Sequence, residues 1–339
     1  MSTAINKMTG TDRFMKWWQR SGLKTLSANS ADLLCSRVLL PYLSTVLKKL
    51  LWASPEVREK LQRNGVNIIP VNFYSNIPSV EEIRSSFEYG NFDTPPYLDS
   101  SIFDPVHLQN VLRDLTPYAS EFNPPTQGDE EEPSGFFWGN SQFSHSDAMA
   151  YYAMIRHIKP RRIIEVGSGF STLVASAALA QNGSGEIVCV EPFPRPFLRS
   201  VPGVVQVVQK PVQQLDIDFF RKGLGDGDIL FIDSTHTVKT GSDCVYLYLK
   251  ILPALERKVM VHVHDVFLPE AMPQEWGLCK QIYWTEQYLL MAYLLDNHRA
   301  KVWFGSNYNR LRNLEALISM MHGRAEAGGG SFWFQLAPR

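Results

Sequence analysis

The fold is decided by IIEVGSGFST, residues 163–172, where an apolar run ends in two glycines and passes into a helix-forming segment. Gly167 and Gly169 let the backbone turn tightly and let a ligand approach the main chain. A dinucleotide-binding turn of the form G-x-G-x-x-G would have a third glycine where this chain has Thr172, a β-branched residue. The turn therefore indicates a strand–turn–helix unit whose ligand is not a dinucleotide.

Segments typical of strands and helices alternate on both sides of this turn. The expected strands are 161–169, 185–192, 204–210, 228–235, 258–265, 301–306 and 331–337, and the expected helices are 144–158, 171–183, 241–255 and 285–298. Such alternation predicts an α/β fold built on a doubly wound, mostly parallel sheet.

Residues 1–135 lack this alternation and are expected to form a mainly helical arm and linker before a single domain over 136–339. Residues 116–135 are rich in Pro, Gly and acids, which predicts a loop. Residues 33–52 are apolar but contain Arg37, two lysines and Pro41, so they predict a Pro-broken pair of amphipathic helices, not a membrane span. Packing of these helices on their own domain is favoured over contact with a membrane surface or a partner.

Composition indicates a folded chain without a strong charge preference. Of 339 residues, 45% are hydrophobic, which is enough for a core, and 33 Lys and Arg balance 34 Asp and Glu to a net charge of -1. No electrostatic attraction to nucleic acid is expected. The four cysteines form no CxxC pair and the N-terminus lacks a signal-peptide pattern, so a cytoplasmic location is expected.

The sequence EVGSGFST resembles the first motif of the class I S-adenosylmethionine-dependent methyltransferases. The resemblance covers about 140–339 and implies a Rossmann-like sheet of seven strands, with 331–337 as the antiparallel one. It also implies that Glu165 lies near the amino-acid moiety of the cofactor and that Glu191, 22 residues after Gly169, bonds the ribose hydroxyls. The cofactor-binding residues implied are Glu165, Gly167, Ser168, Gly169, Ser171, Glu191 and Asp233.

Polar residues end two neighbouring strands of the expected sheet. Asp233 and His236 follow the strand 228–235, while His264 and Asp265 end the strand 258–265. Ligands bind at the carboxyl ends of parallel strands, so Asp233, His264 and Asp265 could converge closely enough to hold a metal. A buried Asp–His pair can instead be a satisfied polar network, and that structural interpretation is preferred for His262.

A narrower resemblance is to metal-dependent O-methyltransferases of macrolide sugars and to cephalosporin hydroxylase-like proteins. Their pattern is D-x-x-H after one strand and E-D after the next. The match implies Asp233 as a ligand and His236 as the general base, but His264 replaces the ligating Glu. Mg²⁺ prefers oxygen ligands, whereas an imidazole favours Mn, Fe, Co or Zn, so the choice among Mg, Mn and Fe stays open.

Residues around these strand ends complete the expected site. Asn140, Phe143 and Asp147 are candidates for a helix covering the cofactor, and Lys239 for an anionic substrate group. The segment after the second strand end contains Trp276, Trp284, Glu286 and Tyr288, which suit an acceptor pocket for rings or sugars.

The sequence therefore predicts O-methylation of a hydroxyl on a small molecule or glycan, dependent on S-adenosylmethionine and assisted by a divalent metal and His236. Two alternatives stay open. One is a hydroxylase-like metalloenzyme on the same scaffold, and the other is a non-catalytic cofactor-binding or interaction protein. A homo-oligomer and peripheral membrane contact are also left open.

Overall fold

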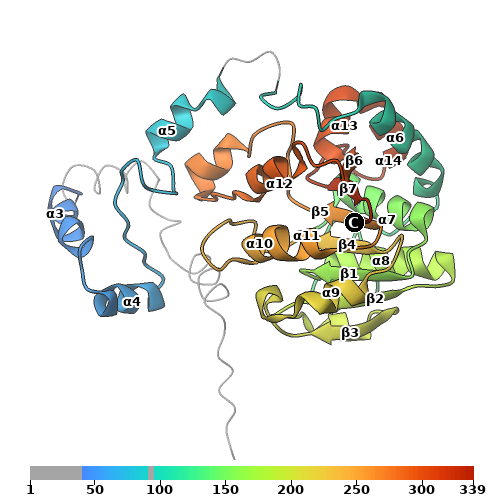
Figure 1. Ribbon diagram of the computed structural model, residues 1–339, viewed down its shortest axis with the longest axis horizontal. Helices are drawn as coiled ribbons and strands as arrows, with labels where there is room; N and C mark the ends of the chain where they lie inside the picture. Colours follow the sequence, from blue (N-terminus) through green and yellow to red (C-terminus); the bar gives the residue numbers. More distant parts are fainter. Residues whose placement is uncertain (1–39, 91–94) are drawn as a thin grey trace, which may run out of the picture. The chain divides into compact units, whose positions relative to one another are not determined.

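The computed structural model describes residues 40–90 and 95–339 (Figure 1). The chain divides into two compact units, one ending at Ser79 and the other running from Val80 to Arg339. Residues 80–135 thus belong to the same unit as the sheet, and the expected domain boundary at 135/136 stays a prediction.

The second unit contains the predicted seven-stranded, mostly parallel sheet, which confirms the α/β fold. The strands lie in the order β3-β2-β1-β4-β5-β7-β6. Their bounds are β1 (Arg162–Val166), β2 (Glu186–Val190), β3 (Val204–Val208), β4 (Ile229–Ile232), β5 (Val259–Val263), β6 (Ala300–Gly305) and β7 (Phe332–Leu336). As predicted, β7 is antiparallel to both of its neighbours.

The central strands β1, β4 and β5 are buried along almost their whole length because helices cover both faces of the sheet. Ile163 belongs to a core shared with α7 and α8, whereas the next residue, Ile164, belongs to a core shared with α9 to α12 (Figure 1). In the register of β1 and β4, Val166 pairs with Ile232, so the two strands end side by side. The strand order reverses between them, which places the expected ligand crevice at these ends.

The helices of this unit, in chain order, have the following bounds. They are α5 (Val80–Ser85), η3 (Phe87–Tyr89), α6 (Pro105–Ala119), α7 (His145–Ile158), α8 (Phe170–Asn182), η4 (Pro196–Ser200), η5 (Val212–Gln214), α9 (Ile217–Gly223), α10 (Asp243–Tyr246), η6 (Leu247–Ile251), α11 (Leu252–Ala254), η7 (Trp276–Lys280), α12 (Glu286–Leu294), α13 (Ser306–Arg312) and α14 (Leu314–Met321). The predicted helix over 241–255 is present as α10, η6 and α11, with a π-helical turn in its middle.

The predicted loop over 116–135 begins later than expected. Helix α6 continues to Ala119 with Pro117 inside its last turn, and it buries an apolar face that includes Leu108, Leu112 and Leu115. This buried face stabilises the helix against the local preference of the Pro-rich sequence. The prediction was wrong at this end because burial outweighs the signal of one proline.

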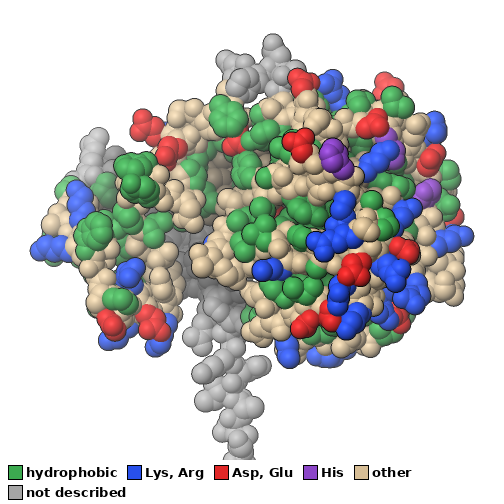
Figure 2. All heavy atoms as spheres, in the orientation of Figure 1, with side chains coloured by type: hydrophobic (Ala, Val, Ile, Leu, Met, Phe, Trp, Pro, Cys, Tyr) green, Lys and Arg blue, Asp and Glu red, His purple; other side chains and the backbone are tan. Residues whose placement is uncertain are grey.

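The unit that ends at Ser79 contains α3 (Leu40–Leu50) and α4 (Pro55–Arg63), in agreement with the predicted helical arm. Residues 33–39 of the predicted helix pair lie outside the described residues. Apolar and basic side chains of this unit lie side by side on its surface (Figure 2). Within the described ranges, no helix is both long and apolar enough to span a bilayer.

Candidate active site

The glycine turn brings the ends of three strands together. The Gly167 amide donates to the Val190 carbonyl at 3.0 Å, and the Asp233 amide donates to the Val166 carbonyl at 2.8 Å. Gly167 has a φ of +85°, and a Cβ at this position would lie 1.8 Å from the carbonyl oxygen of Asp233. Glycine is therefore required twice here, for its conformation and for the approach of the neighbouring strand end.

Thr172, which occupies the place of the third glycine of a dinucleotide turn, holds Glu165. The Thr172 hydroxyl donates to Oε2 of Glu165 at 2.5 Å, and the Tyr151 hydroxyl donates to Oε1 at 2.9 Å. Burial raises the pKa of Glu165 to about 7, against the opposing effect of these hydrogen bonds. Glu165 is thus a buried carboxyl fixed in position beneath the glycine turn.

A cavity of about 440 Å³ opens at this turn. The side chain of Glu191 lines it and accepts from the backbone amides of Ser168 at 3.3 Å and Phe193 at 2.8 Å. The other lining residues are Val166, Gly167, Val190, Pro192, Phe193, Pro211, Val212, Gln213, Asp233, Ser234, Thr235, Lys239, Gly241, Ser242 and Asp243. Three of the predicted cofactor-binding residues, Gly167, Glu191 and Asp233, therefore share one cavity.

The other predicted cofactor-binding residues do not line this cavity. Glu165 and Ser171 are buried, and Ser168 and Gly169 are half-buried at the start of α8. Lys239, a candidate contact for an anionic substrate group although a solvated lysine was preferred, is on the cavity wall.

Asp233 and Asp265 lie between two imidazole rings. Oδ1 of Asp233 is 3.2 Å from Nε2 of His236 and 3.4 Å from Nδ1 of His264. The carboxylate of Asp265 is 3.5 Å from Nε2 of His236 and 3.7 Å from Nδ1 of His264. The two polar strand ends therefore converge.

The predicted metal ligands are Asp233, His264 and Asp265. Among the described residues, the ligand atoms that all lie within 4.8 Å of one another are those of Asp233, His236 and Asp265. His236, predicted as the base, thus lies within reach of the same point. Nδ1 of His264 is buried and has no hydrogen-bond partner in the described part of the chain. These donors suit a cation that accepts both carboxylate and imidazole.

The protonation of this cluster follows from burial and neighbouring charge. Burial alone would lower the pKa of His236, but Asp233 and Glu286 raise it to about 10. Burial opposes protonation of His264 as well, yet the charges of Asp265 and Asp233 raise its pKa well above the usual range. Burial would raise the pKa of Asp233, but the two histidines lower it. While no cation is bound, both rings are therefore held in their protonated form at neutral pH.

On the ring nitrogen that faces away from Asp233, each histidine contacts a further carboxylate, and the sequence patterns did not predict these contacts. Nδ1 of His236 is 2.8 Å from Oε2 of Glu286, and the Tyr248 hydroxyl donates to Oε1 of the same carboxylate at 3.0 Å. Nε2 of His264 is 3.2 Å from Oδ2 of Asp147. The sequence made Asp147 a candidate for a helix covering the cofactor and Glu286 a candidate for an acceptor pocket. The residues next to Asp147 and Glu286 in the sequence do not indicate that these carboxylates contact His264 and His236.

The backbone at both strand ends is in the left-handed region. His236 has a φ of 55° and Asp265 a φ of 57°, conformations that cost about 1–3 kcal/mol each for non-glycine residues. Contacts hold the first of them in place, since the amides of Thr285 and Glu286 both donate to the His236 carbonyl, at 2.9 and 3.1 Å. Strain of this kind is typical of functional sites.

The remaining predicted residues surround the cluster. The side-chain amide of Asn140 donates to the backbone carbonyls of Phe137 and Phe143. The centre of the Phe143 ring lies 4.8 Å from that of His264. His262 stacks on Trp333 at 4.0 Å, an environment that gives it a packing role.

Two aromatic residues of the predicted acceptor segment lie near His236. The ring of Trp284 is 4.3 Å from His236 and 5.0 Å from Trp276. The hydroxyl of Tyr288 donates to Glu88 at 3.1 Å.

Comparison with known proteins identifies a methyltransferase domain within the chain. Residues 164–266 match a family model described as a methyltransferase domain. An uncharacterized protein of Archaeoglobus fulgidus is 31% identical over 161 residues, which cover 45% of this chain and 72% of that protein.

Two solved structures have a similar fold. The O-methyltransferase TomG of Streptomyces achromogenes, involved in tomaymycin synthesis and crystallised with SAM, is 16% identical and gives a TM-score of 0.36. That similarity covers 68% of this chain and 90% of TomG. An O-methyltransferase of Bacillus cereus crystallised with SAH is 13% identical, with a TM-score of 0.34, over 70% of this chain and 94% of that chain. With the family model and the sheet order as evidence, residues 164–266 belong to a methyltransferase domain carried on a Rossmann-like sheet.

Proposed function

We propose that this chain methylates a hydroxyl group of a small molecule or sugar, using S-adenosylmethionine as donor, His236 as base and a divalent metal held by Asp233, His264 and Asp265. The observation that carries the proposal is the position of Asp233. Asp233 lines the 440 Å³ cavity, and its carboxylate contacts the imidazole of His236. The imidazole proposed as the base thus lies at the edge of the cavity assigned to the cofactor.

The cavity suits S-adenosylmethionine. The carboxylate of Glu191 can accept from two vicinal ribose hydroxyls, and Gly167 lines the same cavity. The cofactor supplies a methyl group on a sulfonium, for transfer by in-line displacement. The turn and both strand ends that would hold the two reactants are tied together by backbone hydrogen bonds.

His236 is held in one orientation, and its ring can remove a proton once it is neutral, a state that the charge of a bound cation would favour. Glu286 fixes its Nδ1, so Nε2 faces Asp233 and Asp265. An alcohol is a weak nucleophile until it is deprotonated, so a positioned base favours an oxygen acceptor over an amine. The donor set Asp233, His264 and Asp265 fits a divalent cation, which when bound lowers the pKa of a hydroxyl. Trp284 beside His236 supplies an aromatic plane for a ring or sugar.

A second candidate is a hydroxylase-like metalloenzyme. It is favoured by one observation, that His236 and His264 both approach the same carboxylate of Asp233. Two histidines and a carboxylate are the ligands of many non-haem iron oxygenases. Oxygen consumption by the iron-loaded protein would distinguish it from a methyltransferase.

Calorimetric titration with S-adenosylmethionine and S-adenosylhomocysteine (SAH) tests the cofactor assignment. We expect both to bind, and Glu191→Ala to weaken SAH binding by about 10–100-fold, because hydrogen bonds to a charged group contribute about 1.5–3 kcal/mol. The control is Glu315→Ala, at an exposed glutamate of α14. If neither compound binds the unaltered protein, the proposed function is wrong.

Metal analysis of protein purified without chelator tests the second part. We expect a stoichiometric divalent metal in the unaltered protein and its loss in Asp233→Ala, because that side chain contacts both histidines. Asp226→Ala, at an exposed aspartate before β4, should keep the metal. Undetectable metal together with methyl transfer that EDTA does not change would contradict the metal assignment.

A further inference from the structure

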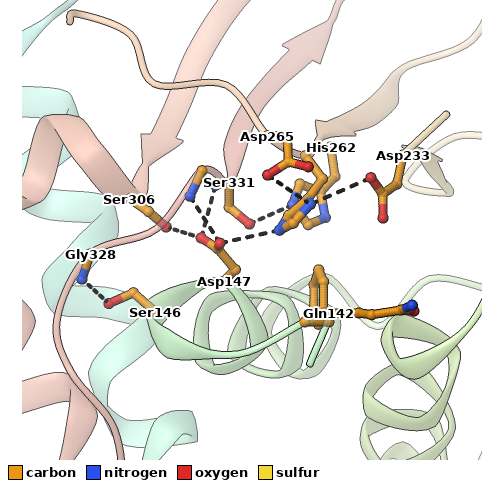
Figure 3. A network of polar contacts seen from close by, with 12 residues as sticks. Gln142, Ser146, Asp147, Asp233, His262, Asp265, Ser306, Gly328 and Ser331 are labelled. Carbon is orange, nitrogen blue, oxygen red and sulfur yellow. Dashed lines mark hydrogen bonds and ion pairs between the residues drawn. The ribbon is translucent and has the colours of Figure 1, made fainter. Parts of the chain in front are cut away.

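The ring of His264 lies between two sets of carboxylates. On one side its Nε2 is 3.2 Å from Oδ2 of Asp147, and on the other its Nδ1 is 3.4 Å from Asp233 and 3.7 Å from Asp265. Figure 3 draws this network, with Asp147 on α7 below and Asp233 at the far side of the imidazoles. The question is which ring nitrogen carries the proton when the imidazole is neutral.

The other partners of Asp147 answer this question. Its Oδ1 accepts from the Ser306 hydroxyl at 2.6 Å and the Ser331 amide at 2.8 Å, while Oδ2 accepts from the Gly330 amide at 2.9 Å. Backbone amides only donate and an ionised carboxylate only accepts. Asp147 is therefore an acceptor toward every neighbour, and Nε2 of His264 must donate to it. A neutral His264 then has its lone pair on Nδ1, facing Asp233 and Asp265.

A glycine segment, residues 328–330, encloses the carboxylate of Asp147. The segment 328–330 is a run of three glycines, and a Cβ at Gly329 would lie 2.4 Å from both oxygens of Asp147. The run is fixed to the start of α7, since the Ser146 amide donates to the Gly328 carbonyl at 3.1 Å and the Gly328 amide donates to the Ser146 hydroxyl at 3.0 Å (Figure 3). The Val266 amide donates to the Gly330 carbonyl at 2.8 Å, which links the glycine segment to the strand end at Asp265.

We propose that Asp147 is a positioning residue that presents Nδ1 of His264 as a metal ligand, and that the site therefore takes a transition metal such as Mn²⁺, Fe²⁺, Co²⁺ or Zn²⁺ in preference to Mg²⁺. The inference rests on the metal site of the proposed function. A carboxylate that holds the remote N–H of a ligating histidine fixes the ring and makes it a better donor. Mg²⁺ prefers oxygen ligands in an octahedron, so an imidazole in the donor set disfavours it.

The rival explanation is a satisfied ion-pair network, in which a doubly protonated His264 joins Asp147 to Asp233 and no metal binds. The two explanations differ in metal affinity. The full chain, stripped with EDTA and dialysed, is titrated with Mn²⁺, Zn²⁺ and Mg²⁺ by calorimetry, and free Mn²⁺ is followed by electron paramagnetic resonance. We expect Mn²⁺ and Zn²⁺ to bind more tightly than Mg²⁺. Failure of Mn²⁺ and Zn²⁺ to bind, or a preference for Mg²⁺, would overturn the inference.

Asp147→Asn tests the role of the carboxylate. An amide NH₂ facing His264 would accept no proton from it and would move the ring proton to Nδ1, so we expect Mn²⁺ affinity to fall by about 10–100-fold. The matched control is Asp228→Asn. Asp228 is also a buried carboxylate held by backbone amides, in its case those of Arg161, Arg162 and Gly225, but it precedes β4 at the opposite end of the sheet. Unchanged Mn²⁺ affinity in a folded Asp147→Asn protein would sink the inference.

His264→Glu provides a second variant that does not depend on the stability of Asp147→Asn. It replaces the imidazole by oxygen donors, so we expect the preference to move toward Mg²⁺; an unchanged preference counts against a ligand role for His264. SAH titration of the same samples keeps the two proposals separate. Loss of SAH binding with Mn²⁺ binding intact contradicts the methyltransferase proposal, whereas intact SAH binding without Mn²⁺ binding contradicts the metal inference.

Discussion

Gly167→Ala is expected to abolish measurable binding of SAH. A Cβ at this position would lie 1.8 Å from the carbonyl oxygen of Asp233, and this atom is backbone, which cannot rotate away. The turn must therefore separate from the end of β4, and this movement deforms the cavity that Gly167, Glu191 and Asp233 line together. We expect SAH affinity to fall by roughly 100-fold or more, which corresponds to about 3 kcal/mol. Calorimetric titration measures it.

Gly183→Ala is the matched control for this variant. Gly183 also has a positive φ, +71°, at the end of α8, but a Cβ there would meet nothing within 4 Å. Both substitutions carry the conformational penalty of about 1 kcal/mol for a left-handed residue, and only Gly167→Ala adds the collision. Equal loss of SAH affinity in the two variants would mean that the contact with Asp233 is unimportant for the cofactor.

His236→Ala is expected to lower the rate of methyl transfer by about 10²–10⁴-fold, the usual contribution of a positioned general base. His236 is not among the residues that line the cofactor cavity, so SAH affinity should stay close to that of the unaltered protein. The measurement is transfer of a tritiated methyl group from S-adenosylmethionine to a protein-free extract of small molecules, with SAH titration alongside. An unchanged rate would remove His236 from the mechanism.

Glu286→Gln tests how His236 is held. The substitution removes the carboxylate charge next to Nδ1 of His236 and keeps the size of the side chain. We therefore expect a smaller decrease in the rate of methyl transfer than for His236→Ala. His298→Ala, at an exposed histidine before β6, is the control for loss of an imidazole and should have no effect.

The fold and the two polar strand ends could be predicted because they depend on local sequence and on one topological rule. A glycine turn after an apolar run fixes β1 and α8, and parallel neighbours place Asp233 beside His264 and Asp265. The roles of Asp147 and Glu286 could not be predicted in this way. Asp147 is 117 residues from His264 along the chain, and Glu286 is 50 residues from His236. Only tertiary packing of helices on the sheet brings such pairs together.

The glycine run at 328–330 and helix α6 illustrate two other limits. Three consecutive glycines indicate a loop, but their reason lies in the carboxylate of Asp147 that they enclose. Helix α6 contains Pro117 and was hidden by the composition around it, although its buried leucines stabilise it. In both cases the decisive contact is distant in sequence, so residue preferences alone do not show it.

Asp233 belongs to two environments at once, the wall of the cavity and the histidine cluster. A ligand in either place changes the field felt by the other through this one carboxylate. By thermodynamic linkage, any factor by which a cation alters cofactor affinity must equal the factor by which the cofactor alters cation affinity. The occupancy of one site would then depend on the supply of the ligand of the other.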